Sequence, residues 1–67
     1  MIGTVRWFNN EKGYGFISCD DKDILVHYSS ILTKGYKSLT KDEIVKLDIV
    51  ETNNGLRAKN VISIKEL

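Results

Sequence analysis

The sequence predicts an all-β fold in the form of one small five-stranded antiparallel barrel. β-branched and aromatic residues gather in short runs separated by turn signals, helical periodicity is poor, and the chain has only 67 residues. Five short strands in so short a chain do not fill two sheets. A single strongly twisted sheet that closes on itself buries a core and protects its edges, so we expect a barrel.

Turn signals divide the chain into the expected elements. They lie at 9–13, at 20–23 and at 53–55, where an Asn-Gly pair favours a type I′ turn. The expected strands are 2–9, 14–19, 24–27, 44–52 and 56–64. A single helical turn is expected at 29–32, because Ser29 is a suitable N-cap. Residues 33–42 have no clear pattern and are expected to form a surface loop that leads to the final hairpin.

Alternation along the strands predicts which side chains face the core. The expected inward set is Gly15, Ile17, Ile24, Val26, Val45, Leu47 and Ile49. The rule fails in two places. Val5 and Trp7 share a parity although we expect one inside and one outside, and Val61 and Ile62 cannot both point inward. Bulges or strong twist would each explain both failures, and parity alone does not decide between them.

Composition and charge exclude several classes of protein. Ten Lys and Arg side chains face nine Asp and Glu, giving a net charge of +1, so any basic site must be local. The single Cys19 allows no internal disulfide and indicates a reducing cytoplasm. No signal peptide is recognisable, and the longest apolar run, 24–26, is far too short to span a membrane. We therefore expect one cytoplasmic domain over 1–67, with no membrane association.

The second and third expected strands present aromatic residues on their outward face. Tyr14 and Phe16 alternate with the inward residues of one strand, and Leu25 and His27 with those of the next. Trp7 is expected nearby on the first strand. An exposed aromatic cluster needs an explanation, and stacking of unpaired bases is a good one because every base has a π-face.

Cationic side chains surround this cluster along the sequence. They are Arg6, Lys12, Lys34, Lys37, Arg57 and Lys59. Such side chains suit a phosphate backbone although the net charge is near zero. The acidic residues are expected away from the aromatic cluster, at 20–23 and around 42–43. The pattern therefore favours single-stranded RNA or DNA as the partner.

Two motifs resemble the ribonucleoprotein motifs of the bacterial cold-shock proteins. Lys-Gly-Tyr-Gly-Phe-Ile at 12–17 resembles the first motif, and Ile-Leu-Val-His-Tyr at 24–28 resembles the second. The likeness continues at 6–9, 35–37 and 58–61, and covers nearly the whole chain in the same order and spacing. The resemblance implies a five-stranded OB-fold that binds single-stranded RNA and DNA, as an RNA chaperone or a cold-induced gene regulator.

The resemblance also implies a set of site residues. The base-stacking surface would be Trp7, Phe8, Tyr14, Phe16, His27, Tyr28 and Tyr36. Polar and phosphate contacts would come from Arg6, Lys12 and Arg57, with Lys37 added because it adjoins Tyr36. Phe8 opposes Val5 and Trp7 in parity, so partial burial and a stacking role are equally open for it.

The chain departs from the family pattern at several positions. Leu25 belongs to the surface but replaces the usual phenylalanine, so one stacking partner is missing. Tyrosines replace the usual phenylalanines at Tyr14, Tyr28 and Tyr36. Leu56 replaces the usual proline of the last hairpin, and the usual glycine before the fourth strand is absent from 41–44.

Other interpretations of the same residues point to different classes of protein. The main alternative is a small barrel that binds a polyproline II peptide on its exposed aromatics. We expect no enzyme, because no nucleophile, base and orienting group come together and no carboxylate pair adjoins His27. No metal or other cofactor is expected, since His27 has no second histidine and Cys19 is distant. Cys19 is read as a small structural residue, and the protein is expected to be a monomer.

Overall fold

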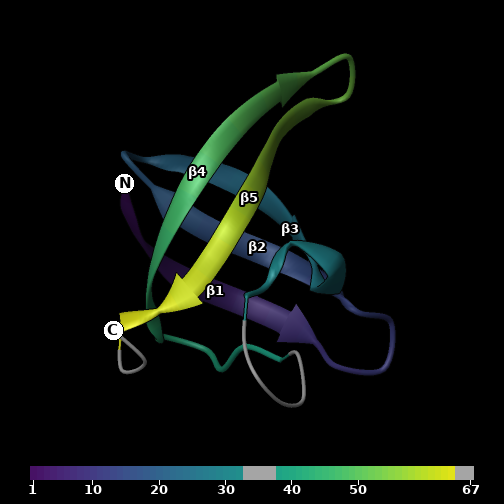
Figure 1. Cartoon of the computed structure of the whole chain (residues 1–67), viewed down its shortest axis with the longest axis vertical. Coiled ribbons are helices and arrows are strands. Elements are labelled where there is room, and N and C mark those ends of the chain that lie inside the picture. The colour runs from purple at the N-terminus through teal and green to yellow at the C-terminus, as the bar shows by residue number, and fades with distance from the viewer. Residues whose placement is uncertain (33–37, 65–67) are drawn as a thin grey trace.

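Five strands close into a barrel around one core, and one short 3₁₀ helix follows the third strand. The structure, a computed structural model, describes residues 1–32 and 38–64. Its elements are β1 (Ile2–Asn9), β2 (Tyr14–Cys19), β3 (Lys22–His27), η1 (Tyr28–Ser30), β4 (Ile44–Thr52) and β5 (Gly55–Ser63) (Figure 1). The all-β barrel expected from the sequence is confirmed. The expected strand bounds shift only at the start of β3 and at both ends of β5.

The order of strands around the barrel is β1-β2-β3-β5-β4, with β4 returning to pair with β1. Every pairing is antiparallel except the one between β3 and β5, where Leu25 lies beside Arg57 in a parallel arrangement. A ring with an odd number of strands cannot alternate direction at every step, so one neighbouring pair must be parallel. The expectation of an antiparallel barrel therefore needs a correction at this single pairing.

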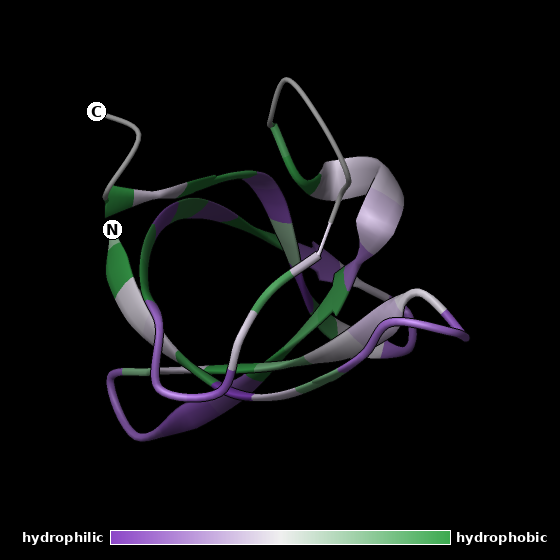
Figure 2. Cartoon of the chain, turned by 90° about the horizontal axis from the view of Figure 1, so that it is seen from below, coloured by the Kyte–Doolittle hydropathy of each residue, from purple (hydrophilic) through white to green (hydrophobic). Residues whose placement is uncertain are grey.

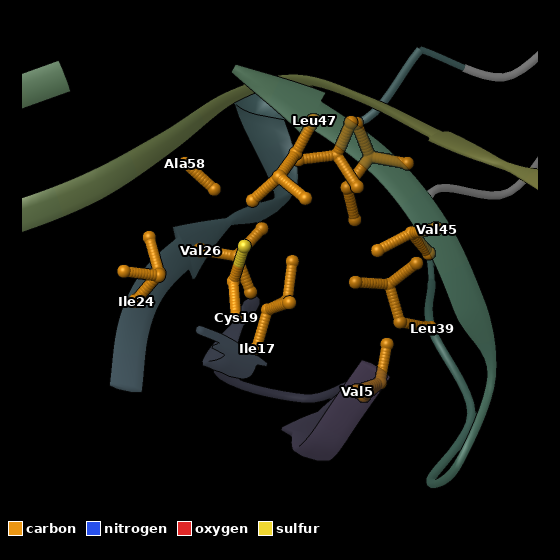
Figure 3. Packing of buried hydrophobic residues seen from close by; sticks show 11 residues of the cluster. Val5, Ile17, Cys19, Ile24, Val26, Leu39, Val45, Leu47 and Ala58 are labelled. Carbon is orange, nitrogen blue, oxygen red and sulfur yellow. The ribbon is translucent and has the colours of Figure 1, made fainter. Parts of the chain in front are cut away.

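The core is built from alternate residues of all five strands together with two residues from outside the strands, Ile31 and Leu39. Its buried side chains are Val5, Ile17, Cys19, Ile24, Val26, Ile31, Leu39, Val45, Leu47, Ala58 and Val61. Figure 3 shows the labelled members converging on the barrel interior from different elements. Seen along another direction in Figure 2, the ribbon forms a closed ring, with hydrophilic residues concentrated in the projecting turns. The predicted inward stripe is confirmed, with Ile49 partly buried against it.

Leu39 shows that part of the expected surface loop is internal. It is buried in the core although it lies within 33–42. Alternation cannot identify such a residue, because residues 38–42 form no strand in which inward and outward positions alternate. Its side chain joins those of the strand residues in the core cluster.

A bulge in β1 explains why Val5 points inward and Trp7 outward. Val5 lies opposite Ile17, and Trp7 lies opposite Phe16, the next residue of β2. Arg6 is therefore an extra residue that reverses the alternation of β1. This irregularity confirms the sequence-based explanation of the first parity failure.

A second irregularity lies in β5. Lys46 pairs with Ile62 and Asp48 pairs with Lys59, so two residues of β5 lie opposite Leu47 alone. Asn60 is one of these two, and it adopts a left-handed backbone with a φ of 54°. Val61 is consequently buried while Ile62 remains partly exposed. The second parity failure thus has the same cause as the first.

The type I′ turn lies in a different hairpin from the one predicted. In the β4–β5 hairpin only Gly55 has a positive φ, 113°, whereas a type I′ turn needs positive φ at both central residues. Asp20 and Asp21 meet this requirement, with φ values of 51° and 64°. They connect Cys19 directly to Lys22, which explains why β3 begins earlier than expected.

Asp42 adopts a left-handed backbone just before β4, with a φ of 70°. Its N–H donates to the Val5 carbonyl oxygen at 2.8 Å, and the Val5 N–H donates to the Glu43 carbonyl oxygen at 2.9 Å. These bonds join the end of the connecting segment to β1. The sequence lacks the glycine usual in this region, and aspartate tolerates the left-handed conformation better than most residues do.

Replacing Asp42 with glycine is expected to stabilise the domain. Glycine adopts the observed φ at no steric cost, so the free energy of unfolding should rise by about 0.5–1 kcal/mol. For a domain of this size, thermal melting should then show a Tm increase of roughly 2–8 °C. Asp42→Asn is the matched control, because it removes the charge and keeps a side chain. A glycine variant no more stable than the asparagine variant would contradict the conformational explanation.

Candidate nucleic-acid interface

A continuous row of side chains crosses the outer face of four strands. Trp7 of β1 lies opposite Phe16 of β2, Phe16 opposite Leu25 of β3, and Leu25 opposite Arg57 of β5. Residues directly opposite each other in a sheet share a face. A second, shorter row places Tyr14 of β2 opposite His27 of β3. The outward orientation expected for Tyr14, Phe16, Leu25 and His27 is confirmed, because Gly15, Ile17, Ile24 and Val26, which alternate with them, are buried.

The aromatic side chains of this face contact one another. The Trp7 ring centroid lies 5.7 Å from that of Tyr14 at an interplanar angle of 71°, and 5.5 Å from that of Phe16 at 58°. These edge and tilted contacts fix ring positions without face-to-face stacking. Trp7 remains 42% exposed. We call Trp7, Tyr14, Phe16, His27 and Tyr28 the aromatic platform.

His27 and Tyr28 are positioned by the start of η1. Their ring centroids lie 4.4 Å apart. His27 is the N-cap of η1: its Nδ1 accepts from the Ser29 backbone N–H at 3.3 Å and lies 2.9 Å from Ser29 Oγ. The predicted cap at Ser29 is therefore wrong, and the turn begins earlier than expected. Because the Ser29 backbone N–H only donates, a neutral His27 carries its proton on Nε2.

The two glycines of the 12–17 motif allow close contacts that shape the platform. A Cβ on Gly13, whose φ is +76°, would lie 2.6 Å from Tyr28 Cδ1, so the Tyr28 ring rests against this residue. A Cβ on Gly15 would lie 2.2 Å from the Trp7 carbonyl oxygen. Only glycine at that position lets β1 and β2 pack at their observed separation. The alternation of glycine with aromatic residues therefore has a steric origin.

Phe8 differs from the platform residues in its orientation. It lies opposite Gly15, a buried position, and its side chain is partly buried against the core. The parity argument that set Phe8 apart from Trp7 therefore describes its position correctly. Phe8 supports the barrel beneath the platform and exposes only part of its side chain.

Arg6 is paired with an acidic side chain. Its Nη1 lies 2.9 Å from Asp23 Oδ1, with the two side chains 57% and 54% exposed. The expectation that all the acids lie apart from the basic residues is therefore wrong for Asp23. Arg6 is the extra residue of the β1 bulge, and sequence parity alone could not place its side chain beside β3.

The other expected polar contacts lie at the margins of the platform. Lys12 is exposed in the β1–β2 turn, where its backbone N–H donates to Asn9 Oδ1 at 2.9 Å. Arg57 is exposed at the end of the row. Tyr36 and Lys37, with Lys34, lie outside the described residues.

Comparison with known proteins agrees with this geometry. The family model described as 'Cold-shock' DNA-binding domain matches residues 1–64. The chain belongs to the cold-shock domain family. The resemblance noted in the sequence is confirmed, and the family is one of nucleic-acid-binding proteins rather than enzymes. The expectation of a non-enzymatic protein is thereby confirmed.

Several relatives of this cold-shock domain are similar over nearly their whole length. Major cold shock protein CspA of Bacillus cereus is 51% identical over 65 residues, which cover 96% of this chain and 97% of the relative. Cold shock-like protein CspB of Bacillus cereus is 50% identical, with coverages of 91% and 95%. A cold shock-like protein of Aquifex aeolicus is 49% identical, with coverages of 88% and 87%.

Other kinds of site find no support in the described part of this cold-shock domain. Within residues 1–32 and 38–64, no three His, Cys, Asp or Glu side chains are grouped as metal ligands. Cys19 is buried, and its Sγ donates to the Ile2 carbonyl oxygen at 3.4 Å, in keeping with a structural role. No helix among these residues is long and apolar enough to cross a membrane.

The ion pair between Arg6 and Asp23 is expected to contribute little stability. Both side chains are more than half exposed, so their coupling free energy should be below about 1 kcal/mol. A double-mutant cycle with Arg6→Gln and Asp23→Asn, followed by urea unfolding, measures this coupling. The coupling should fall further as salt rises, since exposed charges are screened. A larger value that is insensitive to salt would contradict this expectation.

Proposed function

We propose that this cold-shock domain binds single-stranded RNA and DNA by stacking unpaired bases on the aromatic platform. The observation that carries the proposal is the row from Trp7 through Phe16 and Leu25 to Arg57. It combines exposed ring surface with a cation at one end, which suits bases and phosphates in succession. Base–aromatic stacking tolerates any base, so sequence preference should be modest.

The charges of the domain favour a local phosphate path. Among residues 1–32 and 38–64 the structure gives one ion pair, between Arg6 and Asp23. Lys12 and Arg57 therefore keep their charges available at the margins of the platform, whereas Arg6 is partly neutralised. We propose Lys12 and Arg57 as the main phosphate contacts, with Arg6 adding a weaker one.

The remaining predicted residues have unequal roles in the proposal. His27 presents Nε2–H toward a base or a sugar, since Ser29 occupies Nδ1. Phe8 contributes its exposed part at the edge of the platform. Leu25 lies within the row but has no π-face, so a base above it gains van der Waals contact alone. Tyr36 and Lys37 are proposed as further contacts on the strength of the family resemblance.

The proposed binding needs no nucleotide hydrolysis to remodel RNA. A protein that binds only the unpaired strand shifts the equilibrium away from weak hairpins by mass action. This supports a role as an RNA chaperone or a regulator of gene expression, and we propose that the protein acts in the cytoplasm as a monomer.

Titration with oligonucleotides tests the proposed function. Oligo(dT), oligo(dA) and oligo(U) should quench Trp7 fluorescence, whereas a duplex of equal length should bind far more weakly. Log K should fall with log salt by roughly 0.7 per phosphate contacted. A proline-rich peptide is the control for the alternative function. Peptide binding without any response to the single strands would overturn the proposal.

Replacing Leu25 with phenylalanine is expected to extend the platform. Stacking of one base on an aromatic residue is worth about 1–3 kcal/mol, and leucine already supplies part of this. We expect a gain of about 1 kcal/mol, a roughly fivefold tighter complex with oligo(dT).

Thermal melting provides the control for the Leu25 substitution. Leu25 faces outward beside Phe16 and Arg57, so phenylalanine should leave the Tm nearly unchanged. Unchanged or weaker affinity with an intact fold would exclude Leu25 from the stacking surface.

A further inference from the structure

A groove of about 380 Å³ lies between η1 and the β4–β5 hairpin, next to Arg57. It arises where the chain leaves the sheet. β3 pairs with β5 at Leu25 and Arg57, and the chain returns to β5 only where Ile31 lies beside Val61. η1 lies in the segment between these two contacts with β5. The groove therefore begins where the row of the aromatic platform ends.

The groove contains two cations without a carboxylate partner. Arg57 and Lys59 both line it, and neither takes part in an ion pair with the described residues, 1–32 and 38–64. Asp48 lies opposite Lys59, but its Oδ2 accepts from Asn60 Nδ2 at 3.0 Å. A phosphate entering this groove would therefore meet positive charge on its β5 side.

Two apolar side chains complete the groove. Leu32 is 51% exposed and Val50 is 41% exposed, although both line this hollow. Val50 lies opposite Arg57 in the β4–β5 pairing, so it prolongs the row from Trp7 by one more strand. Ser30 supplies a hydroxyl group on the η1 side, where Ser29 also lines the groove with its Oγ held 2.9 Å from His27 Nδ1. Cations, hydroxyl groups and apolar surface together match the parts of a nucleotide.

We propose that this groove binds the nucleotides that follow those on the aromatic platform, on the same single strand. Arg57 adjoins both regions, so one chain of phosphates can pass from the platform to Lys59. The Ser30 hydroxyl group donates to a sugar or phosphate oxygen, while a sugar or base packs against Leu32 and Val50. This inference rests on the proposed function and extends the proposed binding site for the single strand from the aromatic platform into the groove.

Oligonucleotide length separates the groove from the platform. Dissociation constants are measured for (dT)4 and (dT)10 with the wild type, Lys59→Gln and Lys46→Gln. Lys46 is the matched control, an exposed lysine on β4 that pairs with Ile2 at the β1 side of the barrel. Lys59→Gln should weaken (dT)10 by about three- to tenfold at low salt and lower the magnitude of its salt slope by about 0.7. The same variant should leave (dT)4 unchanged, and Lys46→Gln should alter neither ligand.

A second variant tests the apolar side of the groove. Leu32→Asp places a carboxylate there and should weaken (dT)10 more than Lys59→Gln does, again without changing (dT)4. Thermal melting confirms that each variant is folded.

The outcomes separate the groove from the proposed function itself. A wild type that binds neither oligonucleotide overturns the proposed function, and the groove assignment with it. A wild type that binds both, with Lys59→Gln weakening neither or weakening both equally, overturns the groove assignment alone. An equal loss for Lys46→Gln would assign the effect to overall charge and also overturn it.

Discussion

The barrel has room for one set of inward side chains, and every other feature of the domain depends on that constraint. Val5, Ile17, Ile24, Val26 and Val45 have no exposed surface, so strand alternation sends their neighbours outward. The platform exists because those neighbours are aromatic. Trp7 joins them only because Arg6 adds a residue to β1 and reverses its alternation. Core packing and the proposed recognition of bases are thus two consequences of one register.

The usefulness of each charged side chain for binding also depends on its local position. A net charge of +1 gives no general attraction to a polyanion, so the position of each cation relative to the acids decides its usefulness. Arg6 is close to Asp23, whereas Arg57 and Lys59 have no such partner among the described residues. The acidic residues of the β2–β3 hairpin therefore make that side of the proposed phosphate path less favourable. The side next to η1 stays open to phosphates.

The sequence predicted the strands and the outward face well because both depend on local patterns. Alternation identified Tyr14 and Phe16 without any knowledge of the partner strands. It failed where the structure depends on contacts distant in the chain. Leu39 fills the core from a segment without periodicity, and Asp23 pairs with Arg6, the extra residue of the β1 bulge. The type I′ turn was misplaced because the Asn-Gly pair is a statistical preference, whereas Asp20 and Asp21 adopt that geometry under the constraint of a two-residue connection.

The parallel contact between β3 and β5 has a consequence for folding during synthesis. β1, β2 and β3 leave the ribosome first and can pair as a meander, but β1 and β3 are then open edges until β4 and β5 arrive. Such edges are templates for pairing with other chains. Since both are closed by strands late in the sequence, the nascent chain exposes them until most of it has been made. Substitutions that delay closure should therefore first appear as aggregation of newly made protein, before any loss of binding by the folded domain.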